Sequence, residues 1–209
     1  ADGVMAAMRE REQAGVFDPI RKALLLLELG LSDAARTAAE EGIRAKPKSA
    51  FAHYALGTVA GADVLGRWEG PSVDRATAIA AYQKSLELDP NLYGSRQNLM
   101  VLYERNEKGA RFGEGAPLED AARVAREIRA DGTTDVNINL LLHLMYLKKF
   151  DEMLELESKI PVDATSGQLF ALAYIAKKGL PAARRMLSGH NLTVEQIDNV
   201  LRLNTTHLS

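Results

Sequence analysis

Cysteine is absent from this 209-residue sequence. Its absence excludes disulfide bonds, thiolate catalysis and the zinc sites that cysteine builds. Aromatic residues are also scarce, at 6% with a single tryptophan, whereas alanine and leucine dominate, and this composition favours helices over sheets. Hydrophobic residues make up 46% of the chain, which is ample for a continuous core. We therefore expect a folded, all-α protein.

The chain also lacks an excess of either charge. It has 26 basic and 28 acidic side chains and a net charge of −2, so no overall electrostatic attraction to nucleic acid or to an anionic membrane is expected. The longest apolar run, Ala23 to Leu27, is far shorter than the roughly 20 residues of a membrane-spanning helix. We predict neither nucleic-acid binding nor membrane insertion. Because the first residue is Ala1 rather than methionine, we expect a processed chain or a fragment.

No arrangement of catalytic or metal-binding residues is evident. The carboxylate pairs Glu40-Glu41 and Glu119-Asp120 fall on expected helix faces beside basic residues, which is typical of solvated charge. The glycines of 113–115 follow no strand and precede no Lys-Ser/Thr pair, so a phosphate loop is unsupported. We predict no enzyme activity, no metal and no cofactor. The histidines are likewise dispersed, none lying three or four residues from another: His53, His143, His190 and His207.

The clearest pattern is a pair of amphipathic helices within residues 49–91. Apolar residues recur at intervals of three and four over 51–60 and again over 78–88. Pro90 ends the second pattern, because proline cannot continue a helix. Gly57 lies in the middle of the first helix, where two antiparallel helices must approach closely.

The residues of this helix pair resemble a tetratricopeptide repeat (TPR). The resemblance implies a right-handed α-α superhelix of stacked helix pairs, because one such pair cannot bury its apolar face alone. It also implies that other proteins bind on the concave face, which the first helix of each pair builds. The positions that carry the resemblance are the Leu56-Gly57 pair, Ala78, Tyr82, Ser85 and Pro90.

The pattern repeats with a period of 43 residues. Leu56, Gly66 and Ala78 recur as Leu99, Gly109 and Ala121. This period exceeds the usual TPR length of about 34 residues, and the excess lies between the two helices of each pair. We predict one TPR solenoid over 1–209, with about five helix pairs and a terminal capping helix opened by a capping box at Thr193. The expected units are 16–48, 49–91, 92–135, 136–163 and 164–190, followed by the helix 193–203.

Two of the expected inter-helix loops place an arginine beside an aromatic residue, Arg67-Trp68 and Arg111-Phe112. In one interpretation each aromatic packs on its own helix pair while the arginine pairs with an acid such as Glu69 or Glu114. In the other interpretation, the two loops bind a partner domain. Such inserts also resemble the TPR segments of large secreted bacterial proteins that carry a transglutaminase-like domain, which would imply an extracytoplasmic location and catalysis elsewhere in the parent chain.

The TPR resemblance predicts a non-enzymatic scaffold that binds a protein or peptide in a concave groove. The alternative function is a structural spacer that docks a neighbouring domain of the same parent chain through Arg67, Trp68, Arg111 and Phe112. Leu140, Leu144 and Leu147 are further candidates for the groove wall, although for Leu140 and Leu144 we favour a place in the core between repeats. The partner-binding residues carried over from the family are Phe51, Tyr54, Thr58, Gln97, Val101, Glu104, Arg105 and Asn137.

Overall fold

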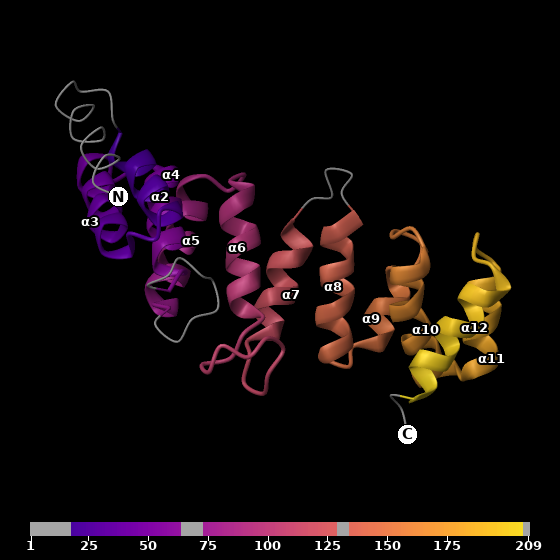
Figure 1. The fold of residues 1–209 in the computed structure, drawn as a ribbon. Helices are drawn as coiled ribbons and strands as arrows, with labels where there is room; N and C mark the ends of the chain where they lie inside the picture. Colours follow the sequence, from indigo (N-terminus) through magenta and orange to yellow (C-terminus); the bar gives the residue numbers. More distant parts are fainter. Residues whose placement is uncertain (1–17, 64–72, 129–133, 207–209) are drawn as a thin grey trace. The chain divides into compact units, whose positions relative to one another are not determined.

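The computed structural model describes residues 18–63, 73–128 and 134–206, and of 134–137 and 203–206 it describes the backbone alone. Within these ranges the chain forms eleven α-helices and no β-strand, which confirms the expected all-α class (Figure 1). No helix in the same ranges has the length and apolarity to cross a membrane. The chain divides into two compact units. We call Ala1–Ala116 the N-terminal unit and Pro117–Ser209 the C-terminal unit.

In the N-terminal unit, each described helix packs against the next one along the chain. Alternate helices also touch, because α2 contacts α4 and α4 contacts α6. The first helix of each helix pair therefore lies against the first helix of the following pair. The helices are α2 (Pro19–Glu28), α3 (Ser32–Ala45), α4 (Ala50–Ala60), α5 (Arg75–Leu88) and α6 (Tyr93–Tyr103).

Local sequence signals account for the ends of these helices. The Asp18 carboxylate accepts a hydrogen bond of 3.0 Å from the backbone N–H of Ile20, and Pro19 occupies the first helical position. Both are typical of a helix N-terminus. Gly30 has φ +72° in the turn that follows α2, a left-handed conformation that glycine adopts at little cost. Ser49 and Asp74 cap α4 and α5 in the same manner as Asp18.

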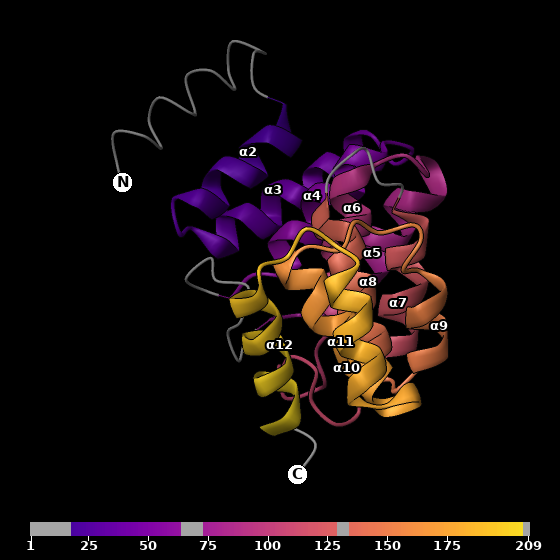
Figure 2. The same cartoon turned by 90° about the vertical axis from the view of Figure 1, so that its right-hand side faces the viewer.

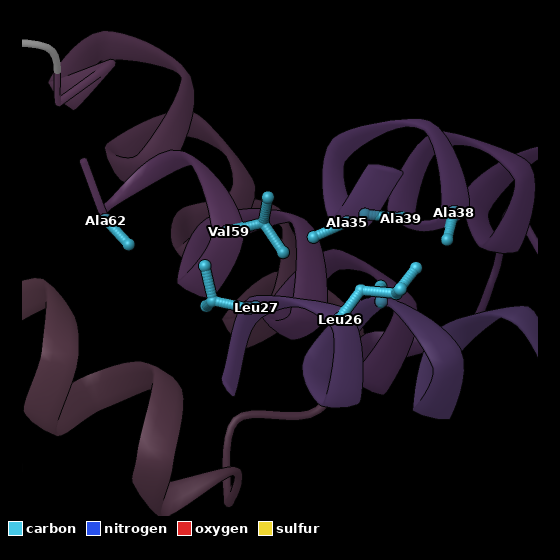
Figure 3. Packing of buried hydrophobic residues seen from close by; sticks show 8 residues of the cluster. Leu26, Leu27, Ala35, Ala38, Ala39, Val59 and Ala62 are labelled. Atoms are coloured by element: carbon cyan, nitrogen blue, oxygen red, sulfur yellow. The ribbon is translucent and has the colours of Figure 1, made fainter. Parts of the chain in front are cut away.

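The core of the first helix pair combines large side chains on one helix with small ones on its neighbour. Leu26 is fully buried and Leu27 nearly so. Figure 3 shows Leu26 of α2 pointing toward the alanines of α3 and Leu27 pointing toward Val59 of α4. Alanine keeps the facing helix close, so the leucines fill the space between the backbones. The other members of this cluster are Ala23, Ala35, Ala38, Ala39 and Ala62.

Gly57 allows α4 and α5 to approach closely. A Cβ atom on Gly57 would lie 2.7 Å from Cε1 of Tyr82, which is far inside van der Waals contact. The Tyr82 ring is fully buried. Its hydroxyl pairs with the Thr58 hydroxyl at 3.1 Å and accepts a hydrogen bond of 2.9 Å from the Asn98 amide. Burial raises the pKa of this phenol well above its ordinary value, so Tyr82 stays neutral and bound to both partners at physiological pH.

A second polar contact joins three helices of the same unit. Ser85 of α5 and Ser95 of α6 are both fully buried, and their hydroxyls are 2.7 Å apart. The Ser85 hydroxyl also donates to the backbone carbonyl of Ala50 in α4 at 2.8 Å. Buried hydroxyls are costly without partners, so this contact both satisfies them and fixes the helices in register.

The C-terminal unit repeats the same kind of packing. α8 contacts α10 and α10 contacts α12, while α9 and α11 pack beside α10. In both views α10, α11 and α12 lie side by side (Figures 1 and 2). The helices are α7 (Leu118–Glu127), α8 (Thr134–Tyr146), α9 (Phe150–Glu155), α10 (Ala164–Lys178), α11 (Leu180–Ser188) and α12 (Val194–Thr206).

The capping box predicted before the last helix is confirmed. The Thr193 hydroxyl accepts from the backbone N–H of Gln196 at 3.2 Å, and the backbone N–H of Thr193 donates to the Gln196 side chain at 2.8 Å. The helix extends to Thr206, three residues beyond the predicted end. α9 is short and ends at Glu155, well before the end of the predicted unit 136–163.

The contact between Gly57 and Tyr82 generates a stability prediction. We expect Gly57→Leu to lower the free energy of unfolding by about 1–3 kcal/mol, because the new side chain must displace a buried ring. The control is Ala80→Leu, which adds the same side chain at an exposed position of α5 and should change stability by less than about 0.5 kcal/mol. Urea denaturation followed by circular dichroism measures both. Equal stability of Gly57→Leu and the wild type would refute the close-packing explanation.

Candidate functional site

The binding face predicted on α4 is partly occupied by contacts within the protein. Tyr54 is half-buried and stacks on Phe51, with ring centroids 5.5 Å apart. Phe51 is 42% exposed, so the outer side of this aromatic pair faces solvent. The Thr58 hydroxyl donates to the Tyr54 carbonyl at 3.0 Å and pairs with Tyr82. Thr58 therefore holds the helices together, whereas Phe51 and Tyr54 offer an accessible apolar surface.

The predicted residues of α6 fall into two groups. Gln97 is exposed and Val101 is partly exposed, so both can meet a partner. Glu104, by contrast, is only 1% exposed and its carboxylate forms a salt bridge of 2.7 Å with the Arg111 guanidinium. The Arg105 guanidinium donates to the Gly109 carbonyl at 3.0 Å. In this structure Glu104 and Arg105 stabilise the loop after α6, and Glu104 has almost no surface to present to a partner.

Asn106 organises the loop 105–116. Its side-chain oxygen accepts from the backbone N–H groups of Lys108 and Ala110, both at 3.0 Å. Its side-chain nitrogen donates to the Glu114 carbonyl, also at 3.0 Å. The backbone N–H of Phe112 donates to the Glu104 carbonyl at 2.6 Å. The loop thus holds a network of polar contacts of its own.

Arg111 and Phe112 agree in part with the interpretation in which the arginine pairs with an acid of its own repeat. The arginine pairs with an acid, but this acid is the buried Glu104 rather than Glu114. The guanidinium carbon lies 4.7 Å from the centroid of the Phe112 ring, within the range of a cation–π contact. The Arg111 side chain nevertheless remains 48% exposed. Arg67 and Trp68 of the other loop, and the side chain of Asn137, lie outside the described residues.

A larger surface feature lies within the C-terminal unit. It is a groove of about 590 Å³ between α8 and α10, the helices on either side of α9 (Figure 1). We call it the α8–α10 groove. Its volume is within the range of about 300–1,000 Å³ that is typical of ligand sites. Its described lining residues are Ile138, Leu142, Met145, Tyr146, Lys148, Phe150, Thr165, Gln168, Leu169 and Leu172.

Each wall of the groove is one face of a helix. Ile138, Leu142 and Met145 recur at intervals of four and three on α8, and 165, 168, 169 and 172 occupy positions i, i+3, i+4 and i+7 on α10. Residues at this spacing share a helix face. Tyr146, at 48% exposure, lies at the end of the α8 wall. The result is an open apolar surface along about two turns of each helix.

The leucines predicted for the groove wall lie on a different stripe of α8. Leu140 is 7% exposed and Leu144 is 1% exposed, so they belong to the core, as the alternative interpretation of these leucines held. Leu147 is half-buried and does not line the groove. The signal for the groove wall was present as the apolar spacing of 138, 142 and 145. This signal could not be told apart from that of the core, because α8 is apolar on two faces.

The structure offers no group of three or more histidine, aspartate or glutamate side chains that could hold a metal, within the residues it describes. His143 is fully buried in α8. The Tyr174 hydroxyl donates to the Glu157 carboxylate at 2.7 Å, and this bond raises the pKa of Tyr174 to about 12. A phenol held in this way keeps its proton at neutral pH and does not act as a general base.

No family model matches this chain, and no curated protein matches it either. Inferences about function therefore depend on the surfaces described above. Of these, the α8–α10 groove is the surface best suited to binding.

The cap of α10, which positions one wall of the groove, generates a pH prediction. The Asp163 carboxylate accepts from the backbone N–H groups of Ser166 at 2.9 Å and Thr165 at 2.8 Å. These bonds, chiefly that from Ser166, hold the pKa of Asp163 below its ordinary value. A lowered folded-state pKa stabilises the fold above the unfolded value of about 3.9, and this stabilisation is lost as pH falls through the folded pKa.

We expect Asp163→Ala to lower the free energy of unfolding by about 1 kcal/mol at pH 7. Asp163→Asn keeps an acceptor oxygen but cannot titrate, so its stability should fall less than that of the wild type between about pH 5 and pH 3. Urea denaturation at four pH values in this range and at pH 7 measures both effects. Identical pH profiles for Asp163→Asn and the wild type would contradict the cap assignment.

Proposed function

We propose that this chain is a non-enzymatic interaction scaffold of the tetratricopeptide type, and that it binds a peptide segment of another protein in the α8–α10 groove. The observation that carries the proposal is the groove itself, an open apolar surface of about 590 Å³ with one helix face on each side. The proposal also assigns the helix pairs of both units to a right-handed α-α solenoid of about five pairs.

Two observations support the tetratricopeptide assignment. The first helices of successive pairs touch one another, as α2, α4 and α6 do in one unit and α8, α10 and α12 in the other. Gly57 and Tyr82 also lie in contact, at the positions that carry the resemblance to the family. In such repeats the first helices build the binding wall, and α8 and α10 are both first helices of their pairs.

A peptide fits the groove better than a small polar molecule does. Apolar anchors repeat along both walls over about two helical turns, which matches the spacing with which an amphipathic peptide presents its side chains. The hydroxyl group of Thr165 lies on the α10 wall, where a peptide backbone has hydrogen-bonding groups to satisfy. A small polar ligand would instead leave most of the apolar wall uncovered.

The test compares two substitutions of exposed apolar residues in the same unit. Tyr146, at 48% exposure, lines the groove, whereas Leu180, at 42% exposure, begins α11 and does not. Peptides are first selected against the whole wild-type chain from a random library of 12-residue sequences. We expect Tyr146→Glu to weaken their binding by at least about tenfold, because a carboxylate would have to be desolvated against apolar anchors.

Leu180→Glu should bind these peptides as the wild type does, and both variants should keep the wild-type melting temperature. Fluorescence anisotropy measures the affinities. Equal binding by Tyr146→Glu and the wild type would disprove the groove as the site. If the double variant Tyr54→Ala/Gln97→Ala lost binding instead, the site would lie on the exposed face of α4 and α6.

The alternative function, docking of a neighbouring protein domain, has one observation in its favour. The loop 105–116 is fixed by internal hydrogen bonds and still leaves Arg111 about half exposed beside Phe112. Arg75 strengthens this arrangement by donating to the backbone carbonyls of Leu102 and Arg105. A rigid arginine next to an aromatic ring is a common anchor at protein interfaces.

The absence of cysteine allows the two functions to be compared directly. A single cysteine at residue 108, three residues before Arg111 in the loop, or at residue 142, in the groove, attaches a photocrosslinker at one place only. With a purified partner, crosslinks from 142 and none from 108 are expected for groove binding. The reverse pattern is expected if the loop docks a neighbouring domain. Residue 180 serves as the control, and efficient crosslinking there would contradict both functions.

A further inference from the structure

Lys148 ends α8 in a conformation that is unusual for lysine. Its φ is +56°, in the left-handed region that glycine favours. The backbone N–H of Lys148 donates to the Met145 carbonyl at 3.0 Å, and that of Lys149 donates to the Leu144 carbonyl at 2.8 Å. This pair of bonds is the Schellman arrangement, in which glycine usually occupies the left-handed position.

The turn itself does not explain the lysine. Glycine would form the same two hydrogen bonds without the steric cost of a Cβ atom in this conformation. A cation near a helix C-terminus is favourable, but Lys149 already supplies one. A strained residue that has a simpler substitute points to a role outside the turn.

The neighbouring charges are already paired. The Lys149 ammonium lies 2.7 Å from the Glu119 carboxylate and 3.5 Å from Glu152, and Lys177 pairs with Asp151 at 2.7 Å. Lys148 is exposed, and no carboxylate of the described residues lies within ion-pair distance of its ammonium group. It also lines the α8–α10 groove, whose other described lining residues are uncharged.

We infer that the groove selects peptides that combine apolar anchors with a carboxylate group, and that Lys148 recognises this carboxylate. The inference rests on the proposed function and specifies the ligand of the same groove. The apolar walls hold the anchors, while a compact ammonium at the end of α8 supplies a point charge and hydrogen-bond donors. An acidic group on the peptide is complementary to it, and a basic group is repelled.

The experiment begins with peptide selection. A random library of 12-residue peptides is selected in parallel against the whole wild-type chain, Lys148→Glu and Lys159→Glu. Lys159 is an exposed lysine of the same unit that does not line the groove, so its variant controls for the change in net charge. We expect aspartate and glutamate to be enriched beside apolar residues with the wild type and Lys159→Glu, and lysine and arginine with Lys148→Glu.

The second step measures affinity with the strongest acidic peptide and its glutamine counterpart. Replacing the acid should weaken binding to the wild type about threefold to tenfold and leave binding to Lys148→Gly unchanged. Added salt should weaken only the wild-type complex with the acidic peptide. A version of the same peptide with an amidated C-terminus lacks the terminal carboxylate, so it shows whether a side-chain or the terminal carboxylate is recognised. Lys148→Gly should melt at the wild-type temperature or above it, since glycine relieves the strain.

Several results would overturn the inference while the groove remains the binding site. One is the selection of neutral peptides by every variant, and another is the selection of acidic peptides equally by the wild type and Lys148→Glu. The third is that replacing the peptide's acid lowers its affinity for Lys148→Gly as much as for the wild type. A lower melting temperature of Lys148→Gly with unchanged peptide affinity would assign the lysine to the helix end. Selection of no peptide by the wild type would overturn the proposed function and the inference with it.

Discussion

The fully buried Tyr82 ring joins three helices of the N-terminal unit. The ring packs against the bare backbone of α4 at Gly57, and the hydroxyl joins Thr58 of α4 to Asn98 of α6. The distance between α4 and α5 depends on the first contact, and the position of α6 depends on the second. The Tyr82 hydroxyl is buried and makes two hydrogen bonds. The helices therefore cannot shift without exposing this hydroxyl to solvent or leaving it without a hydrogen-bond partner.

Much of the fold could be predicted from short-range signals. Gly57, the capping box of α12 and the proline after α5 each act through the local backbone, and the structure places them where the pattern indicates. The wall of the α8–α10 groove could not be predicted in the same way. Two faces of α8 are apolar, and only the packing of its neighbours decides which face, that of Leu144 or that of Leu142, is covered.

The loop after α6 shows a second limit of sequence reasoning. Its composition predicted that Arg111 would pair with an acid, but the partner is Glu104, seven residues earlier. This choice depends on how the chain turns, and the turn depends on one asparagine that satisfies three backbone groups. Glu104, which the family pattern predicted to contact a partner, is thus buried and holds the loop through Arg111. Helical periodicity says nothing about such loop geometry.

The contacts between helices join elements that are close along the chain. Within each unit, the helices that touch are neighbours along the chain or next but one, so nearly every contact closes a short stretch of polypeptide. Short closures cost little chain entropy, and proteins dominated by them fold in microseconds to milliseconds. A nascent chain can therefore complete each helix pair soon after that pair has been synthesised, and few apolar faces need to wait for a distant partner.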